Sequence, residues 1–80
     1  MRSGLSLYYS PYCFFCHKVL GYMSKNNIEI ELKNTSDREN AAALMQGGGK
    51  TQVPCLRIED DSQVQWMYES NDIIAYLGRA

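Results

Sequence analysis

Two cysteines separated by two residues carry the most evident chemistry in this sequence. Cys13 and Cys16 follow an alternating apolar segment at residues 5–9 and precede a helical pattern, so they lie at a strand-to-helix turn. The N-terminus of a helix presents free N–H groups and the positive end of the helix dipole, which favour the thiolate form of a sulfur placed there. Because the thiolate is the reactive form of cysteine, the pattern predicts thiol–disulfide exchange.

The two cysteines are expected to have different roles. Cys13 would stand at the N-cap of the helix and Cys16 one turn inside, so we expect Cys13 to be the more exposed and more acidic thiol. The Cys13 thiolate would attack a disulfide and form a mixed disulfide, and Cys16 would then attack Cys13 and release the second product. The alternative, a buried and inert pair with the same spacing, is disfavoured because the pair lies where a helix begins.

The same cysteines allow two cofactor interpretations. With His17 they match the pattern for covalent attachment of a c-type haem, although a solvent-facing or hydrogen-bonded histidine is the simpler interpretation. Cys55 is interpreted as a buried small residue, as a third redox thiol, or as a ligand to zinc or an iron–sulfur cluster shared with the pair. Because Cys55 is far along the chain and two phenylalanines would crowd a cluster at the turn, we expect no metal.

Two later segments have the residue types of a peptide-binding site. Gln52-Val53-Pro54 opens a predicted strand, where proline is tolerated although it donates no hydrogen bond to a neighbouring strand. Free backbone groups there can pair with an extended peptide, for example glutathione or a cysteine-containing segment. Glu69-Ser70-Asn71 combines a helix cap with the N–H groups of a helix N-terminus, which suit a carboxylate. Taken alone, each segment also fits an ordinary strand start or helix cap.

The composition predicts one small domain over residues 1–80. The chain is 45% hydrophobic and 21% charged, and its net charge of -1 gives no electrostatic signature for nucleic acid or an anionic membrane. No segment reaches the roughly 20 apolar residues of a membrane span, and the first residues lack the apolar core of an export signal. We therefore expect a monomeric cytoplasmic protein that binds neither nucleic acid nor membranes.

The hydrophobic pattern in the first half predicts alternating strands and helices. Residues 5–9 alternate as a strand does, and a helix of about three turns follows Cys13 and ends at Asn26-Asn27. Residues 28–32 predict a second strand with three apolar side chains on one face and two glutamates on the other. Ser36 and Glu39 form a predicted capping box for a second helix, which we expect Gly47-Gly48-Gly49 to end.

The second half predicts a hairpin and a last helix. Apolar residues at positions 56, 58, 64 and 66 flank a polar turn at 59–62, which predicts two short strands. Ser70 is the predicted cap of a last helix with Ile73, Ile74 and Leu77 on one side. The resulting order, βαβαββα, predicts an α/β fold of the thioredoxin-like (glutaredoxin) type, a four-stranded mixed sheet flanked on both faces by about three helices.

The cysteine, proline and serine motifs, in this order and spacing, resemble the glutaredoxin family over almost the whole chain. The resemblance rests on Cys13-Phe14-Phe15-Cys16, Gln52-Val53-Pro54 and Glu69-Ser70, and it is closest to glutaredoxins that look like the N-terminal domain of glutathione S-transferases. It implies a glutathione-dependent thiol–disulfide oxidoreductase that reduces protein disulfides or glutathione mixed disulfides, with glutathione as co-substrate. Its partners would be glutathione and disulfide-containing or glutathionylated proteins.

The resemblance also implies roles for individual residues. Pro54 takes the place of the family's cis-proline, and the backbone of Val53 pairs with the cysteinyl part of glutathione. Residues 69–71 take the γ-glutamyl end, and Phe15 flanks the bound tripeptide. The residues expected to bind glutathione are Phe15, Gln52, Val53, Pro54, Glu69, Ser70 and Asn71.

Three positions depart from the glutaredoxin pattern. Phe14 replaces the proline usual after the first cysteine, and Ser10 stands where many members carry a basic residue. Tyr68-Glu69 replaces the paired glycines of many small glutaredoxins, which favours the transferase-like branch, whose members usually continue into a helical second domain. The alternatives are therefore a glutathione S-transferase-like module and a non-catalytic thioredoxin-fold binding module.

Overall fold

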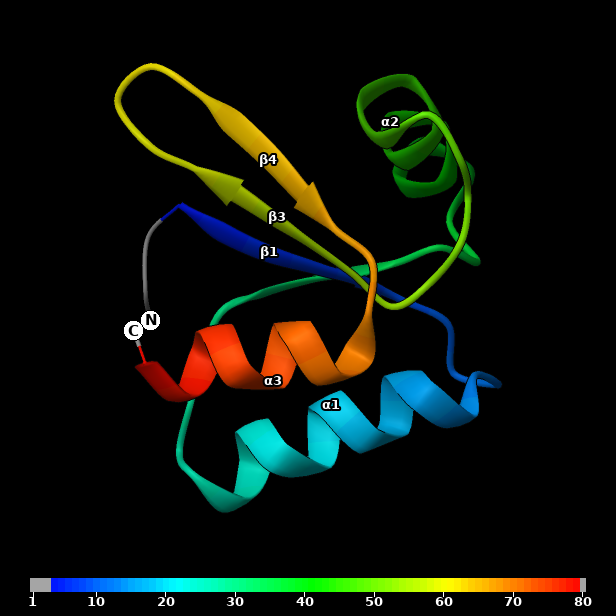
Figure 1. Cartoon of the computed structure of the whole chain (residues 1–80). Helices are drawn as coiled ribbons and strands as arrows, with labels where there is room; N and C mark the ends of the chain where they lie inside the picture. Colours follow the sequence, from blue (N-terminus) through cyan, green and yellow to red (C-terminus); the bar gives the residue numbers. More distant parts are fainter. Residues whose placement is uncertain (1–3, 80) are drawn as a thin grey trace.

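Four strands and three helices alternate along the chain in the computed structural model, which describes residues 4–79 (Figure 1). The elements are β1 (Leu5–Tyr9), α1 (Phe14–Lys25), β2 (Glu31–Asn34), α2 (Arg38–Gly48), β3 (Cys55–Glu59), β4 (Val64–Met67) and α3 (Ser70–Arg79). Their order, βαβαββα, is the predicted one.

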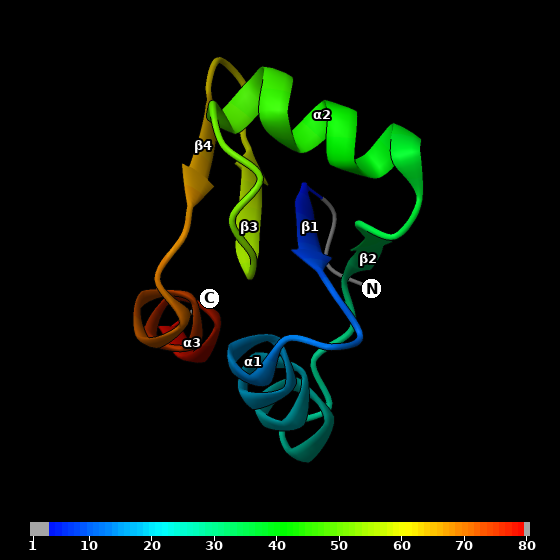
Figure 2. The ribbon, with the colours of Figure 1, turned by 90° about the vertical axis from the view of Figure 1, so that its right-hand side faces the viewer.

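One mixed sheet organises these elements. Its strands lie in the order β2-β1-β3-β4, with β1 parallel to β2 and antiparallel to β3, and with β3 antiparallel to β4. Helices α1 and α3 lie side by side below the sheet in Figure 2, and α2 crosses above it. The predicted thioredoxin-like fold is confirmed.

The two faces of the sheet bury different amounts of apolar surface. Successive side chains of a strand point to opposite faces, so Leu7 of β1 and Leu56 of β3 meet α1 and α3 in the main core. On the other face, Tyr8 and Cys55 pack with Leu44 of α2 in a much smaller cluster. The main core consists of Leu5, Leu7, Val19, Met23, Ile30, Leu56, Ile58, Ile73 and Leu77.

Helix α1 begins and ends as predicted. Cys13 is its N-cap, and Asn26 is its C-cap. Asn27 then adopts a left-handed conformation with φ of 55°, and the Ile28 N–H donates to the Met23 carbonyl at 2.9 Å. This is the Schellman arrangement, in which asparagine takes the place most often held by glycine.

The second strand begins three residues and ends two residues later than predicted. β2 is Glu31–Asn34, paired in parallel with β1 from Ser6 to Tyr9, whereas the alternation predicted residues 28–32. The Ile28 N–H is used in the hydrogen bond that ends α1, so pairing with β1 begins only at Glu31. Ile30 is buried ahead of the strand, and Leu32 is 47% exposed on this edge strand, so the expected apolar face is only partly correct.

The cap of α2 is Asp37 and not Ser36. The Asp37 carboxylate accepts the Glu39 N–H at 3.0 Å. Ser36 lies one residue too early, because its own N–H donates to the Asn34 side chain at 2.9 Å in the turn after β2. The predicted capping box is therefore wrong by one residue.

The three glycines at the end of α2 have different functions. Only Gly49 ends the helix, in a left-handed conformation with φ of 87°. Gly47 and Gly48 lie inside the helix, and a Cβ atom on either would overlap the Trp66 ring or the Tyr68 hydroxyl. The predicted stop is thus correct only for Gly49, and its two neighbours allow α2 to approach β4.

The hairpin of β3 and β4 turns where predicted. The Asp60 carboxylate accepts backbone N–H groups from Ser62 and Gln63 at 3.3 and 3.0 Å, which closes the turn.

No helix within residues 4–79 combines the length and apolarity that a membrane span requires.

Candidate functional site: a thiol pair beside a proline turn

The thiol pair lies at the start of α1 in the predicted arrangement. Cys13 is half-buried and its sulfur accepts the Cys16 N–H at 3.2 Å, so the sulfur acts as the N-cap acceptor. Cys16, one turn later, is fully buried. Both thiols are free. The Cys16 N–H and the positive end of the α1 dipole therefore both point at the Cys13 sulfur.

Burial sets the protonation of the inner thiol. It raises the pKa of Cys16 to about 12, and the hydrogen bond with Cys13 contributes in the same direction. Cys16 therefore remains protonated near neutral pH, and a protonated thiol is a poor nucleophile.

The proline motif lies directly opposite the thiol pair. The Val53-Pro54 peptide bond is cis, as the resemblance implied. The Cys13 thiol lies 3.7 Å from the Val53 carbonyl oxygen, to which it donates a weak hydrogen bond. Pro54 is buried, whereas Val53 is half-buried. A residue that pairs with the Val53 backbone would thus lie next to the Cys13 sulfur.

A cavity of about 140 Å³ opens beside this contact. Its walls come from the first turn of α1, the segment before β3 and the start of α3. Six of the seven residues expected to bind glutathione line it, which brings three distant motifs together. The lining residues are Phe15, Gln52, Val53, Pro54, Tyr68, Glu69 and Ser70.

The start of α3 differs in detail from the prediction. The Glu69 carbonyl accepts the Ile73 N–H at 2.9 Å, so Glu69 occupies the cap position and Ser70 is the first helical residue. The predicted serine cap is therefore wrong by one residue, because the chain enters the helix earlier. Asn71 does not line the cavity, and its side-chain oxygen accepts the Lys18 ammonium at 2.7 Å.

Tyr68 is the cavity residue that sequence reasoning missed. Its ring forms part of the wall, its hydroxyl donates to the Lys50 carbonyl at 3.2 Å, and the Lys50 ammonium lies 4.5 Å from the ring centre. Its position directly before Glu69 was the available signal, but Tyr68 was interpreted only as a departure from paired glycines.

The remaining cofactor candidates do not converge on the thiol pair. Cys55 is buried in the smaller cluster on the α2 face, where burial raises its pKa to about 11 and a Tyr68 hydrogen bond acts in the opposite direction. His17 Nε2 lies 2.7 Å from the Pro11 carbonyl oxygen. In the part of the chain with described coordinates, no three His, Cys, Asp or Glu side chains form a group that could hold a metal ion.

Aromatic side chains surround the outer side of the thiol pair. Tyr12 is 92% exposed and Phe14 is 76% exposed, and the Phe14 and Phe15 rings meet edge to face with centroids 5.5 Å apart. Position 10, where many glutaredoxins carry a basic residue, holds Ser10, whose hydroxyl oxygen accepts the Tyr12 N–H at 3.3 Å.

Comparison with known proteins identifies the family. The family model for the glutathione S-transferase N-terminal domain matches residues 12–80. The chain belongs to this family. The predicted resemblance to the transferase-like branch is therefore confirmed, and the thiol pair with its cis-proline lies in a glutathione S-transferase N-terminal domain. A search among curated proteins finds no match.

Two solved structures are similar to this transferase-type domain. The trimeric glutathione transferase TDR1 of Leishmania superposes with a TM-score of 0.74 and 28% sequence identity, over 94% of this chain and 17% of that chain. The chain thus spans less than one fifth of the length of that transferase. A glutaredoxin of Brucella melitensis superposes with a TM-score of 0.58 and 16% identity, over 95% and 79% of the two chains, and supports the fold.

Proposed function

We propose that this domain is a glutathione-dependent thiol–disulfide oxidoreductase in which Cys13 attacks and Cys16 resolves. The observation that carries the proposal is the position of the Cys13 sulfur. It is half-buried, accepts the Cys16 N–H in the first turn of α1, and lies 3.7 Å from the carbonyl oxygen of Val53, which lines the cavity. A thiolate in this place can reach a sulfur presented by a peptide paired with Val53.

In this proposal, glutathione lies along the cavity as an extended peptide. Its cysteinyl backbone would pair with Val53, which places its sulfur next to Cys13. Its γ-glutamyl carboxylate would lie at the N-terminus of α3, close to Ser70, where free N–H groups favour an anion. The rings of Phe15 and Tyr68 would form the side walls. Asn71 would act indirectly, because its side-chain oxygen accepts a hydrogen bond from Lys18 of α1 and so links the start of α3 to that helix.

The proposed reaction transfers two electrons from thiols to a disulfide. The Cys13 thiolate attacks the glutathione sulfur of a glutathionylated protein, the mixed disulfide breaks, and the protein thiolate leaves and takes up a proton. Cys13 now carries glutathione. A second glutathione thiolate then attacks that glutathione sulfur, which releases oxidised glutathione and restores Cys13. With a protein disulfide, the Cys13 thiolate first attacks one protein sulfur. Cys16 then loses its proton and attacks Cys13, which breaks the Cys13–protein bond, releases the reduced protein and forms a Cys13–Cys16 disulfide. Two glutathione thiols reduce this disulfide and leave as oxidised glutathione.

The buried Cys16 suits the resolving role. Its raised pKa keeps it protonated while Cys13 reacts, so the two sulfurs do not compete for the substrate. Once Cys13 is part of a mixed disulfide, its charge no longer disfavours ionisation of Cys16, and only burial continues to do so. The supply of reduced glutathione in a reducing cytosol matches this cycle.

A second candidate is glutathione conjugation, as in a transferase. The family and the similarity to the Leishmania transferase favour it. In this case glutathione would attack an external electrophile with its own thiolate, and Cys13 would only donate a hydrogen bond to that sulfur. The proposals differ in one measurable step, because only the first forms a covalent bond between Cys13 and glutathione.

Thiol variants test the proposed function. With a glutathionylated peptide as substrate, we expect Cys13→Ser to lower kcat/KM by about a thousandfold or more, because an alcohol supplies no thiolate near neutral pH. Cys16→Ser should retain this reaction when glutathione is supplied, and without free glutathione it should accumulate a Cys13–glutathione adduct visible in the mass spectrum. Unchanged turnover of Cys13→Ser would remove the proposal, and conjugation of an aryl halide by the same variant would favour the transferase.

A further inference from the structure

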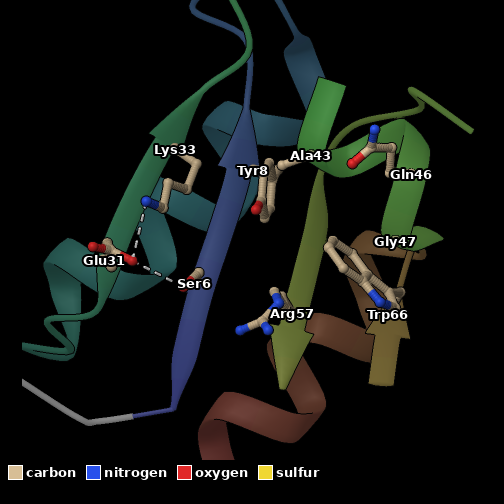
Figure 3. A pocket seen from close by; sticks show the side chains of 9 residues that line it. All are labelled: Ser6, Tyr8, Glu31, Lys33, Ala43, Gln46, Gly47, Arg57 and Trp66. Atoms are coloured by element: carbon tan, nitrogen blue, oxygen red, sulfur yellow. Dashed lines mark hydrogen bonds and ion pairs between the residues drawn. The ribbon is translucent and has the colours of Figure 1, made fainter. Parts of the chain in front are cut away.

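A second, larger depression lies on the face of the sheet that carries α2. It encloses about 480 Å³, and none of the residues that line it lines the glutathione cavity. Helix α2 packs on Tyr8 and Cys55 but leaves the neighbouring row of the sheet open (Figure 3). The strand register defines that row: Ser6 pairs with Glu31 and with Arg57, and Arg57 pairs with Trp66.

One end of this groove is aromatic. The Trp66 ring lies against Gly47 of α2, which has no side chain to cover the ring. The centroids of the Tyr8 and Trp66 rings are 5.6 Å apart, and the two rings are tilted by 46°. Trp66 is only half-buried, although it packs against the cluster of Tyr8, Leu44 and Cys55. An indole beside an open space of this size can stack with a planar ring.

The other end of the groove carries two half-buried cations. Lys33 on β2 and Arg57 on β3 stand on either side of β1, with the Ser6 hydroxyl between them (Figure 3). Glu31 is engaged by Lys33 at 3.4 Å and by the Ser6 hydroxyl at 3.2 Å. Arg57 meets Glu59 at 3.1 Å, and its guanidinium lies 5.7 Å from the Trp66 ring.

The Arg57 contacts leave its guanidinium available to a ligand. Its partner Glu59 has a side chain that is 56% exposed, and an ion pair of this kind contributes little to stability. A guanidinium presents several N–H donors in a plane, so it can bind a carboxylate or phosphate while its face stays near an aromatic ring. The aromatic and cationic ends therefore adjoin at Arg57.

We propose that this groove binds a small planar aromatic anion, with its ring beside Trp66 and its charged group between Arg57 and Lys33. The volume lies in the range of small-molecule sites. An aromatic carboxylate and a nucleoside monophosphate share this chemistry. The proposal is independent of the thiol reaction, because the two sites share no residue.

Trp66 provides the readout, since it is the only tryptophan in the chain and gives one indole N–H signal in the NMR spectrum. The full chain, labelled with ¹⁵N, is titrated with 2-naphthoate and with adenosine monophosphate. Each has an uncharged counterpart, 2-naphthalenemethanol and adenosine. We expect a saturable shift of the Trp66 signal with one or both anions, and an affinity about tenfold lower or worse for the uncharged counterparts.

Variants decide whether the proposed residues form the site. Arg57→Gln and Lys33→Gln should each weaken binding about tenfold, whereas Lys25→Gln on the exposed side of α1 and Cys13→Ser should leave it unchanged. If Arg57→Gln lowers the melting temperature, Lys33→Gln provides the same test. The anion whose titration reaches saturation shows whether the groove accepts an aromatic carboxylate, a nucleoside monophosphate or both. A shift that does not saturate, or that persists unchanged in both glutamine variants, overturns the proposal.

Discussion

The two faces of the sheet are stabilised in different ways. On one face, α1 and α3 bury a continuous apolar core against β1 and β3, and the thiol pair stands at the start of α1. On the other face, Leu44 is the one fully buried side chain of α2 among the described residues. Gly47 and Gly48 have no side chains, so α2 can lie close to Trp66 and Tyr68. The first face buries the larger core beside the thiol pair, and the second leaves room for a polar groove.

Each face also contains one buried thiol with a different environment. Cys16 lies behind Cys13 at the start of α1, whereas Cys55 lies among Tyr8, Leu44 and Tyr68 on the other face of the sheet. The same residue type is thus part of the proposed chemistry on one face and part of the packing on the other. The surroundings, and not the residue, decide the role.

The largest expected difference between the faces concerns the cores. Leu7→Ala should lower the free energy of unfolding by about 3–5 kcal/mol, because Leu7 is fully buried in the main core. Leu44→Ala should cost less, about 2–3 kcal/mol, since the smaller cluster can collapse onto the gap. Urea denaturation measures both, with exposed Leu32→Ala as the control. Equal losses for Leu7 and Leu44 would contradict the comparison.

A glycine substitution tests how α2 is held. Gly47→Ala should lower the free energy of unfolding by about 1–3 kcal/mol, because the added methyl group would overlap the Trp66 ring. Gly21→Ala in α1 is the matched control, since nothing lies within 4 Å of its Cβ position and alanine favours a helix by about 0.5–1 kcal/mol. Thermal denaturation of both variants should therefore shift in opposite directions. A stabilised Gly47→Ala would show that α2 does not depend on this contact.

The cap of α2 is a smaller effect of the same kind. Asp37→Ala should cost about 1 kcal/mol, because the Glu39 N–H loses its acceptor. Ser36→Ala should change the free energy of unfolding by less than about 0.5 kcal/mol, since the Ser36 side chain does not cap the helix. The two alanine variants, compared in one denaturation series, distinguish the observed cap from the one that the sequence pattern predicted.

The remaining expected effect is a loss of stability at alkaline pH. Folding raises the pKa of Cys16 to about 12 and of Cys55 to about 11, chiefly through burial, so the folded state holds both protons more tightly than the unfolded state does. Their contribution to stability is therefore complete below about pH 9 and is lost as the pH rises toward 11 and 12. Between about pH 8 and about pH 10.5, Cys55→Ala should lose less stability than the unaltered protein.

The control for the alkaline effect is the exposed Leu32→Ala. This variant removes no titratable group and should leave the pH dependence of the melting temperature unchanged. An identical pH dependence in Cys55→Ala and in the unaltered protein would show that burial of Cys55 does not couple its proton to folding.

The order of the elements and the placing of the reactive turn followed from local patterns. Strand alternation before Cys13 and helical periodicity after it predicted the N-cap position of that thiol, since both patterns depend on neighbouring residues alone. The proline and serine motifs predicted most of the cavity wall through resemblance. The ends of elements were less predictable, because two neighbouring residues can each occupy the N-cap position of a helix. In the structure Asp37 caps α2 in place of Ser36, and Glu69 precedes α3 in place of Ser70.

Contacts between distant residues required the tertiary structure. No local pattern in the sequence places Tyr68 in the cavity wall, sends Cys55 to the opposite face from the thiol pair, or brings Gly47 onto the Trp66 ring. The charged groove likewise exists because the register aligns residues from all four strands in one row. Local sequence determines which turns and helices form, since they depend on neighbours along the chain. The pairing of strands determines which side chains meet.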